Sequence, residues 1–212
     1  MSQLTLRQQV YDRIKQDIIT CALAPGQLVN ESEMAKLLEV SKTPVREALT
    51  RLAQDTLVEL IPRKGYLVTT PALSDIQEIF ELRLILERAA TELAAERITD
   101  AEIKKLGRYL EIDFAPDDRD NLHHYIQANK DFHMEIAEAS RNSRLIQNLE
   151  RSIDDVQRLH YMALGAGNGP WDWSDDHRQL IETLQKRDRE AAAAVVEETI
   201  ADLRLHLLIP QA

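Results

Sequence analysis

Cysteine is almost absent from this 212-residue sequence, which contains Cys21 alone. A single cysteine excludes a disulfide framework and any zinc site built from several cysteines. Long apolar runs are also missing, because the longest, Ala191 to Val196, is far too short to cross a bilayer. The first residues, Met-Ser-Gln-Leu-Thr-Leu-Arg, lack the apolar region of a signal peptide. These absences predict a soluble, cytoplasmic protein with no membrane partner.

The net charge of -10 is unevenly distributed along the chain. Residues 1–72 contain nine Lys and Arg against eight Asp and Glu, whereas the remaining residues contain 17 against 28. The overall charge alone argues against a nucleic-acid partner, because DNA repels an acidic protein. The asymmetry weakens that objection, since a near-neutral first region can approach a polyanion while the acidic remainder does not.

The first region has the pattern of three helices. Apolar residues at helical spacing predict helices over 6–23 and 31–38, separated by a break at Ala24-Pro25-Gly26. A third helix is expected to have Thr43 as its N-cap and Pro44 at its first position, where the missing N–H of proline has no partner to lose.

A β-hairpin is expected after the third helix. Residues 57–61 and 66–70 are predicted as strands, and Pro62-Arg63-Lys64-Gly65 joins them as a turn. Three helices followed by a hairpin indicate a winged helix-turn-helix domain, which we place at residues 4–71. The expected fold class of the whole chain is mainly α.

The third helix carries the side chains expected to contact DNA. A helix that reads the major groove needs a polar N-terminal turn, and Arg46 can bridge two acceptors of guanine. Lys42 suits a phosphate, as a flexible point charge. The candidate DNA-binding residues, which include the basic tip of the hairpin, are Ser41, Lys42, Thr43, Pro44, Arg46, Thr50, Arg63, Lys64 and Gly65.

The stretch from Ser41 to Leu52 (SKTPVREALTRL), preceded by LVNE at 28–31 and followed by RKGYLV at 63–68, resembles the winged-helix domain of GntR-type transcription regulators. The resemblance implies a homodimer that binds a short palindromic operator in double-stranded DNA, with Arg46 reading a base. One departure is Glu39, where this family commonly has glycine in the turn between two helices. A left-handed backbone there would strain a non-glycine residue by about 1 kcal/mol.

No strand is expected beyond residue 74. Helical periodicity predicts helices near 74–96, 100–112, 119–139, 142–164, 174–186 and 189–207. We therefore expect a linker at 72–77 and an all-α helical bundle at 78–208.

The second region resembles the all-helical effector domain of the FadR subfamily, the type called FCD. The matching stretches are RLILE at 83–87, NKDFH at 129–133, and His177 followed by Asp188 and Ala192. The resemblance implies that the domain binds a small carboxylate, often near a metal ion held by one acidic side chain and three histidines.

The metal site is expected to be degenerate. Asn129 and His133 share one helix face, and His177 comes from another helix. An amide at Asn129 replaces the acidic ligand of the family, and Thr199 stands where a further histidine is expected. Two imidazoles, an amide and a hydroxyl are a poor donor set, so the sequence predicts no definite cofactor, with zinc or nickel at Asn129, His133 and His177 as the one candidate. The alternative is that both histidines hydrogen-bond to their neighbours in the interior.

A carboxylate effector favours arginine, whose planar fork matches two oxygens. The candidate effector-binding residues are Arg83, Asn129, His133, Arg158, His177 and Thr199. For both arginines the alternative is an ordinary surface ion pair. The loop at 165–170 is expected to cover the pocket with Trp171 and Trp173, and its glycines follow no strand, so they form no phosphate-binding loop. His123 and His124 are expected at the surface, and His160 in the pocket.

The sequence thus predicts a DNA-binding transcription regulator, acting as a repressor, whose helical domain senses a small organic acid such as a sugar acid or an amino acid. In one alternative the helical domain serves only dimerisation. In another the chain is a metal-dependent hydrolase that uses His133 and His177. That function lacks an activated nucleophile, an HExxH motif and a carboxylate pair, so we do not expect an enzyme.

Overall fold

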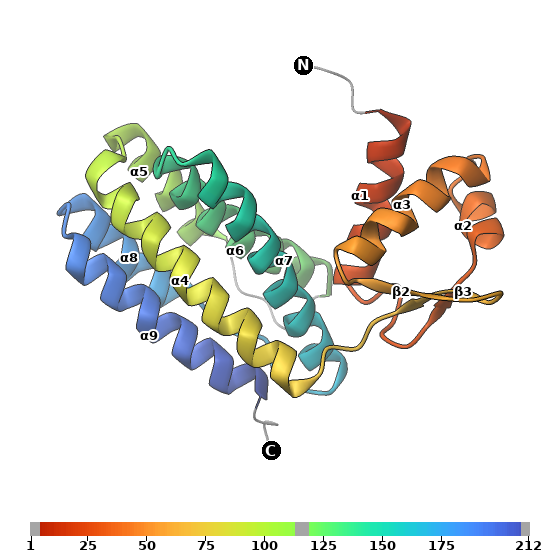
Figure 1. Ribbon diagram of the computed structural model, residues 1–212. Helices are drawn as coiled ribbons and strands as arrows, with labels where there is room; N and C mark the ends of the chain where they lie inside the picture. Colours follow the sequence, from red (N-terminus) through yellow and green to blue (C-terminus); the bar gives the residue numbers. More distant parts are fainter. Residues whose placement is uncertain (1–4, 113–118, 209–212) are drawn as a thin grey trace. The chain divides into compact units, whose positions relative to one another are not determined.

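The computed structural model describes residues 5–112 and 119–208, and the chain divides into two compact units, Met1–Leu73 and Ser74–Ala212. Figure 1 shows the elements of each unit. None of the helices in the described ranges combines the length and the apolar character that crossing a bilayer requires.

The first unit is a helical domain with a small sheet. Its elements are α1 (Leu6–Ile19), β1 (Leu28–Val29), α2 (Glu31–Leu37), α3 (Lys42–Gln54), β2 (Val58–Ile61) and β3 (Gly65–Val68). The antiparallel sheet has the strand order β1-β3-β2. Its core combines apolar side chains from all three helices and all three strands, among them Ile14, Ile18, Val29, Met34, Leu49, Leu52, Val58 and Val68.

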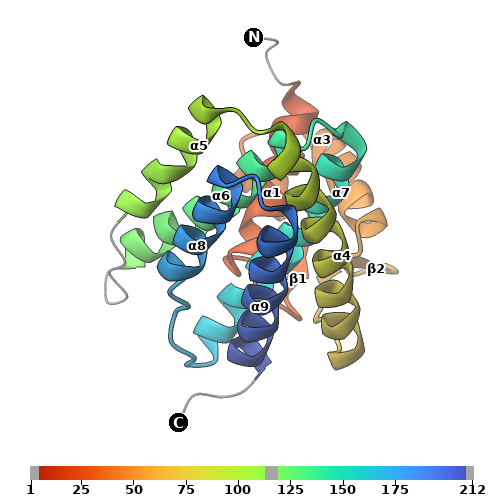
Figure 2. The same ribbon diagram turned by 90° about the vertical axis from the view of Figure 1, so that its left-hand side faces the viewer.

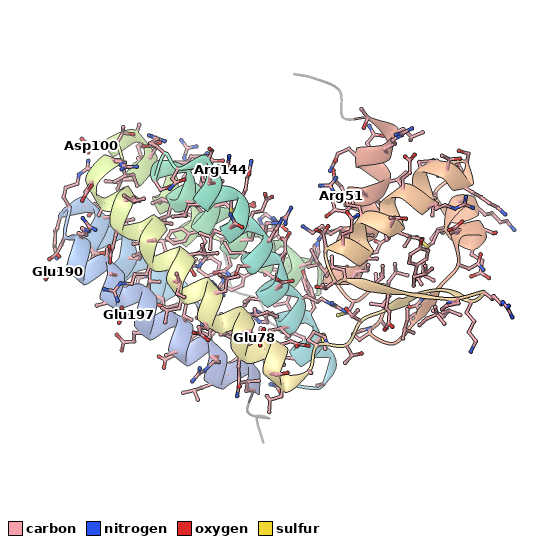
Figure 3. The ribbon with its side chains drawn as sticks, viewed as in Figure 1. Arg51, Glu78, Asp100, Arg144, Glu190 and Glu197 are labelled. Carbon is pink, nitrogen blue, oxygen red and sulfur yellow. The ribbon has the colours of Figure 1, made fainter. Side chains whose placement is uncertain are left out.

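Two side-chain contacts fasten α1 to α3. The guanidinium of Arg51 on α3 lies 3.8 Å from the ring centre of Tyr11 on α1, and Figure 3 labels this arginine beside α1. The hydroxyl of Tyr11 donates to Asp55 Oδ2 at 2.6 Å, just beyond the end of α3. A cation over an aromatic ring and a charge-assisted hydrogen bond both hold the orientation of α3 on the core.

The third helix begins one residue earlier than expected. Ser41 is its N-cap and Pro44 is its third residue, so the prediction of Thr43 as cap and Pro44 as first residue was wrong. The physical reason is that backbone N–H groups throughout the first turn lack an acceptor within the helix, so proline fits at any of those positions.

The sheet contains a strand that the sequence did not predict. β1 pairs with β3 through Leu28↔Leu67 and Val29↔Tyr66. A strand of two residues is too short to display an alternating pattern, so β1 is recognisable only from its pairing with β3. Gly65 has φ +121°, and a Cβ built there would lie 2.5 Å from the carbonyl oxygen of Val29. The close approach of β1 therefore requires glycine at the start of β3.

The second unit is all-helical. Its elements are α4 (Leu73–Arg97), α5 (Asp100–Gly107), a 3₁₀ turn (Arg108–Glu111), α6 (Arg119–Ala139), α7 (Ser143–Gly165), α8 (Ser174–Gln185) and α9 (Arg189–Leu208). The region expected to be a linker at 72–77 is helical from Leu73 onward. Ile76 and Ile79 explain this extension, because they continue the apolar stripe of α4 and pack against the core.

One apolar core joins the helices of the second unit. It includes Phe80 of α4, Leu106 of α5, Phe132 of α6, Leu159 of α7, Leu184 of α8 and Val196 of α9. α4 and α9 lie side by side in both ribbon views (Figures 1 and 2). Arg189 on α9 donates to Glu92 at 2.9 Å and to Glu96 at 2.6 Å, both on α4. These exposed ion pairs add little stability but help fix how the two helices align.

Candidate DNA-binding surface and effector cavity

α3 has one buried face and one exposed face. The buried residues are Pro44, Val45, Ala48, Leu49 and Leu52. The exposed face carries Ser41, Lys42, Thr43, Arg46 and Thr50 from the candidate DNA-binding set. Pro44 belonged to that set, but its burial makes it a support for the helix start and not a surface residue. We call the exposed residues at positions 41, 42, 43, 46 and 50 the α3 surface.

The N-terminus of α3 is open to an anion. Ser41 is the N-cap but its side chain makes no capping hydrogen bond, and the first turn contains no acidic residue. The first backbone N–H groups of a helix have no partner within the helix, and the helix dipole favours negative charge there. The start of α3 is therefore suited to a phosphate group.

Arg46 is exposed and held in a fixed orientation. Its Nε donates to both carboxylate oxygens of Glu31, at 3.1 and 3.0 Å, and its Nη2 donates to Oε2 at 2.9 Å. The side chain of Arg46 is 64% exposed. The hydrogen bond and the charge of Glu31 raise the pKa of Arg46 above its usual value. Arg46 thus remains a cation with much of its guanidinium facing solvent.

The tip of the hairpin presents two exposed cations. β2 and β3 are paired through Ile61↔Gly65, and a three-residue loop that contains Arg63 and Lys64 joins them. The backbone of Lys64 donates to the carbonyl of Ile61 at 3.0 Å, which closes the loop. Two cations on a narrow tip suit the minor groove or the phosphate backbone.

The helical unit contains a small cavity of about 20 Å³. This is room for about one or two waters. Its lining consists of Arg83, Ile126, Asn129, Lys130, His133, Ile153, Val156, Gln157, His160, Trp171, Trp173, Thr199 and Leu203. The contributions of α6 and α7 each follow the spacing i, i+3, i+4, i+7, which places them on one face of each helix. We call this space the effector cavity.

The structure brings together four of the six candidate effector residues in this lining, namely Arg83, Asn129, His133 and Thr199. His177 lines an adjoining space of about 10 Å³ with Glu87, and His133 and Thr199 border both spaces.

Arg158 is buried but does not belong to the lining of either space as the described residues define it. The reason lies in the helical phase: Ile153, Val156, Gln157 and His160 share the face of α7 that borders the cavity, and position 158 is turned away from it. Sequence reasoning missed Lys130 and Gln157. Both lie at i+4 from lining residues and could have been found once one position of each face was known.

Arg83 and Glu87 form a buried ion pair one turn apart on α4. Arg83 Nε donates to Glu87 Oε2 at 2.9 Å, and their side chains are only 2% and 3% exposed. Glu87 Oε1 also pairs with Nδ1 of His133. Burial opposes the charge of Glu87, but the positive charges and hydrogen bonds of Arg83 and His133 prevail and lower its pKa to about 2. Arg83 therefore takes part in an ion pair, as in the alternative considered from the sequence, but this pair lies in the interior and not at the surface.

His177 is enclosed by aromatic rings. Its ring stacks against Phe132 at 3.6 Å and against Trp173 at 4.1 Å, measured between ring centres. Its Nε2 lies 3.4 Å from Nε2 of His133. Burial lowers the pKa of His177 well below the usual value, and the neighbouring His133 and Arg83 lower it further. His177 is therefore a neutral interior imidazole at pH 7.

His160 holds the loop between α7 and α8. Its Nε2 accepts a hydrogen bond from the backbone N–H of Trp171 at 3.4 Å. Burial lowers the pKa of His160 to about 4, with smaller contributions from His206 and Arg83. His206 Nε2 lies 2.8 Å from the carbonyl oxygen of Gly169 in the same loop. Both tryptophans of this segment reach the cavity, while His123 and His124 are exposed.

The donor set does not fit a zinc or nickel site. The Nε2 atoms of His133 and His177 are close enough to share one ion, but the other two ligand positions expected from the sequence hold the neutral oxygens of Asn129 and Thr199. Neutral oxygens bind such ions more weakly than carboxylate or imidazole does. Within the described residues no group of three or more His, Cys, Asp or Glu is arranged to hold a metal.

An exposed cationic helix start on a winged helix-turn-helix, joined to an all-helical unit with a buried charged cavity, defines a DNA-binding transcription regulator. Residues 6–68 match the family described as bacterial regulatory proteins of the gntR family, and residues 78–202 match the FCD domain. The chain belongs to the GntR family of transcription regulators and carries an FCD domain.

Related proteins share this function. The HTH-type transcriptional repressor RspR of Escherichia coli strain K12 is 27% identical over 201 residues, covering 93% of this chain and 87% of that protein. The Nta operon transcriptional regulator of Aminobacter aminovorans is 29% identical over 179 residues, covering 81% and 80%.

A solved structure shows the same fold. E. coli McbR/YncC matches with a TM-score of 0.77 at 24% identity, covering 94% of this chain and 97% of that one. Because the family and these relatives are transcription regulators and not enzymes, the hydrolase alternative is set aside.

Proposed function

We propose that this regulator is a repressor that binds a palindromic operator as a homodimer and releases it when a small carboxylate occupies the effector cavity. The relative named as a repressor supports the direction of regulation. The observation that carries the proposal is the α3 surface, where a cationic, uncapped helix start lies over a fully buried apolar face.

In the proposed complex, α3 lies in the major groove and Arg46 donates two hydrogen bonds to guanine. Ser41, Lys42 and Thr43 at the helix start contact phosphates, and Thr50 lies further along the same face. Arg63 and Lys64 follow the minor groove or the backbone beside it. Release of counterions from the phosphates makes binding fall steeply with salt.

Selection of bound fragments from random duplex DNA tests the DNA-binding role. We expect a palindrome whose half-sites contain a conserved guanine. Arg46→Ala should cost about 1–3 kcal/mol of operator binding and relax the preference at that base. Lys42→Ala is the matched control from the same helix turn, because a lost phosphate contact weakens all duplexes alike and lowers the salt slope by about one. Unchanged sequence preference in Arg46→Ala would contradict the role of Arg46.

We propose that Arg83 is the anchor for the carboxylate. It uses Nε for Glu87, which leaves its Nη1 and Nη2 edge for a ligand with two oxygens. Asn129, Gln157 and Thr199 add neutral donors and acceptors to the lining. This combination favours a small acid that also carries hydroxyl or amino groups, and it requires side chains to move because the enclosed space is small.

Calorimetry against a panel of sugar acids, amino acids and short organic acids tests the effector role. We expect one class of acid to bind and Arg83→Lys, which keeps the charge but loses the planar fork, to weaken that class at least about tenfold. Arg88→Lys on the same helix, at an exposed position, is the matched control. If no acid on the panel binds, the helical unit serves dimerisation alone.

We propose that α4 contributes to the homodimer interface. Leu82 and Ile85 lie one turn apart on α4 and are 51% and 59% exposed. Apolar side chains of this size gain about 1.5–3 kcal/mol each when buried. A second copy of the chain would cover this pair, in agreement with the dimers that the family typically forms.

A further inference from the structure

Arg46 and Glu31 form a two-pronged contact at the centre of the α3 surface. Glu31 is the first residue of α2, and Arg46 is the fifth residue of α3. The contact uses Nε and Nη2 of the arginine, with donor-acceptor distances between 2.9 and 3.1 Å. Nε and Nη2 lie along one side of the planar guanidinium. The other edge, formed by Nη1 and Nη2, carries further N–H groups that remain available.

The edge that stays available is the one that a guanine can use. Bridging O6 and N7 of guanine needs two N–H groups that point forward from the guanidinium. Glu31 holds the side of the group, so it does not need to leave when Arg46 meets a base. A carboxylate at the first residue of a helix is itself favoured by the helix dipole, which anchors Glu31 in place.

We propose that Glu31 is a positioning residue that holds Arg46 in the orientation for base reading before DNA arrives. This inference rests on the proposed role of Arg46. Arginine carries considerable rotamer freedom, which an unbraced side chain loses on binding. Because Glu31 already restricts Arg46 in the free protein, less rotamer freedom is lost when Arg46 binds the base that fits this orientation. Other bases do not gain from it, so Glu31 increases the discrimination between sequences. Its negative charge at the same time disfavours loose attachment to arbitrary phosphates.

The test compares dissociation constants for two duplexes of equal length, the sequence recovered by selection and a randomised sequence. The measured quantity is the discrimination ratio, which is the dissociation constant for the randomised duplex divided by the dissociation constant for the selected duplex. Glu31→Gln keeps the shape of the side chain and removes its charge. The ratio should fall about 2- to 12-fold, which corresponds to the cost of ordering one flexible side chain. Binding to the randomised duplex should become tighter, because one negative charge has been removed.

Glu33→Gln is the matched control. Glu33 lies in the same first turn of α2 and is exposed. Its removal changes the charge equally, so it should tighten both complexes together and leave the ratio unchanged. An unchanged ratio in Glu31→Gln, or a ratio that rises, would overturn the proposal, since a rise means that Glu31 competes with DNA for Arg46.

A double variant separates positioning from an independent effect of Glu31. In an Arg46→Ala background, Glu31→Gln should not change the ratio further. If Glu31→Gln lowers the ratio as much in this background as in the protein that retains Arg46, Glu31 acts without Arg46 and the proposal is wrong. The proposed base-reading role fails separately: an Arg46→Ala protein with the ratio of the unmodified protein rejects that role, whichever result Glu31→Gln gives. Thermal unfolding of each variant shows that it is folded before its ratio is compared.

Discussion

Glu39 lies at the turn between α2 and α3 with φ 55°, in the left-handed region where glycine is favoured. Glu39 departs from the GntR pattern described above, in which glycine is common at this position. The backbone of Val40 donates to the carbonyl of Ala35 at 3.0 Å, a bond that closes the end of α2 and requires the left-handed residue before it. The chain therefore carries local strain in the turn that sets the angle of α3.

Glu39→Gly should raise the free energy of unfolding by about 0.5–1 kcal/mol, because it removes the strain while adding some disorder to the unfolded chain. Thermal or urea unfolding measures the change. Glu33→Gly, in the helical part of α2, should lower stability by about 1 kcal/mol. A stabilisation at both positions, or at neither, would show that the backbone of the turn does not determine the effect.

His160 makes stability depend on pH. Its pKa is about 4 in the folded protein, against 6.5 for an ordinary histidine. Between these values the unfolded chain binds a proton that the folded chain does not, so this contribution is complete above pH 6.5 and is lost as the pH falls toward 4. His160→Gln should reduce the loss of stability between pH 7 and pH 4.5 by about 2–3 kcal/mol.

Urea unfolding at a series of pH values measures this slope. His124→Gln, which removes an exposed imidazole, is the control and should follow the unmodified protein. Glu87 adds a second, more acidic dependence: its lowered pKa contributes stability above pH 4.5 that disappears as the pH falls toward 2. An equal slope in His160→Gln and the unmodified protein would contradict the buried, neutral state of His160.

At the scale of elements, the sequence predicted most of the architecture. The helix expected over 119–139 has the bounds Arg119–Ala139, because a long amphipathic pattern is recognisable from the local sequence alone. The two-residue strand β1 could not be predicted, since its existence depends on a neighbour that is distant in sequence. The effector cavity was predicted in part. Helical spacing placed Asn129 and His133 on one face, the FCD resemblance supplied His177, and the chemistry of carboxylate binding suggested Arg83. Arg158 lies outside the lining because packing, and not the local sequence pattern, sets the rotation of α7 about its axis.

The exposed pair on α4 leads to a prediction about assembly. Leu82→Asp combined with Ile85→Asp should weaken dimerisation at least about 100-fold, because each buried Leu or Ile contributes about 1.5–3 kcal/mol. Analytical ultracentrifugation over a concentration series measures the change. Leu60→Asp, at a position 59% exposed like Ile85 but in β2, should leave the dimer intact. An unchanged dimer in the double variant would exclude this face of α4.

At the scale of the whole molecule, the proposed regulation requires energetic coupling between two units that fold around separate cores. In the proposed mechanism, the effector favours arrangements in which the two α3 surfaces no longer match the spacing of their half-sites. Coupling must be reciprocal, so the operator should weaken effector binding by the same factor, about 5- to 150-fold, by which the effector weakens operator binding. Titrating the effector with and without operator duplex measures both factors, and an effector affinity that ignores the operator contradicts the mechanism.

The aromatic enclosure of His177 has a practical consequence. The chain contains two tryptophans, and both line the effector cavity. Trp173 also stacks on Tyr125 at 4.2 Å between ring centres. All indole fluorescence of this protein therefore originates at one place, next to a charged group and a histidine. A ligand that enters that space should therefore shift the emission spectrum of the unlabelled protein, so compounds can be screened by fluorescence without knowing the operator.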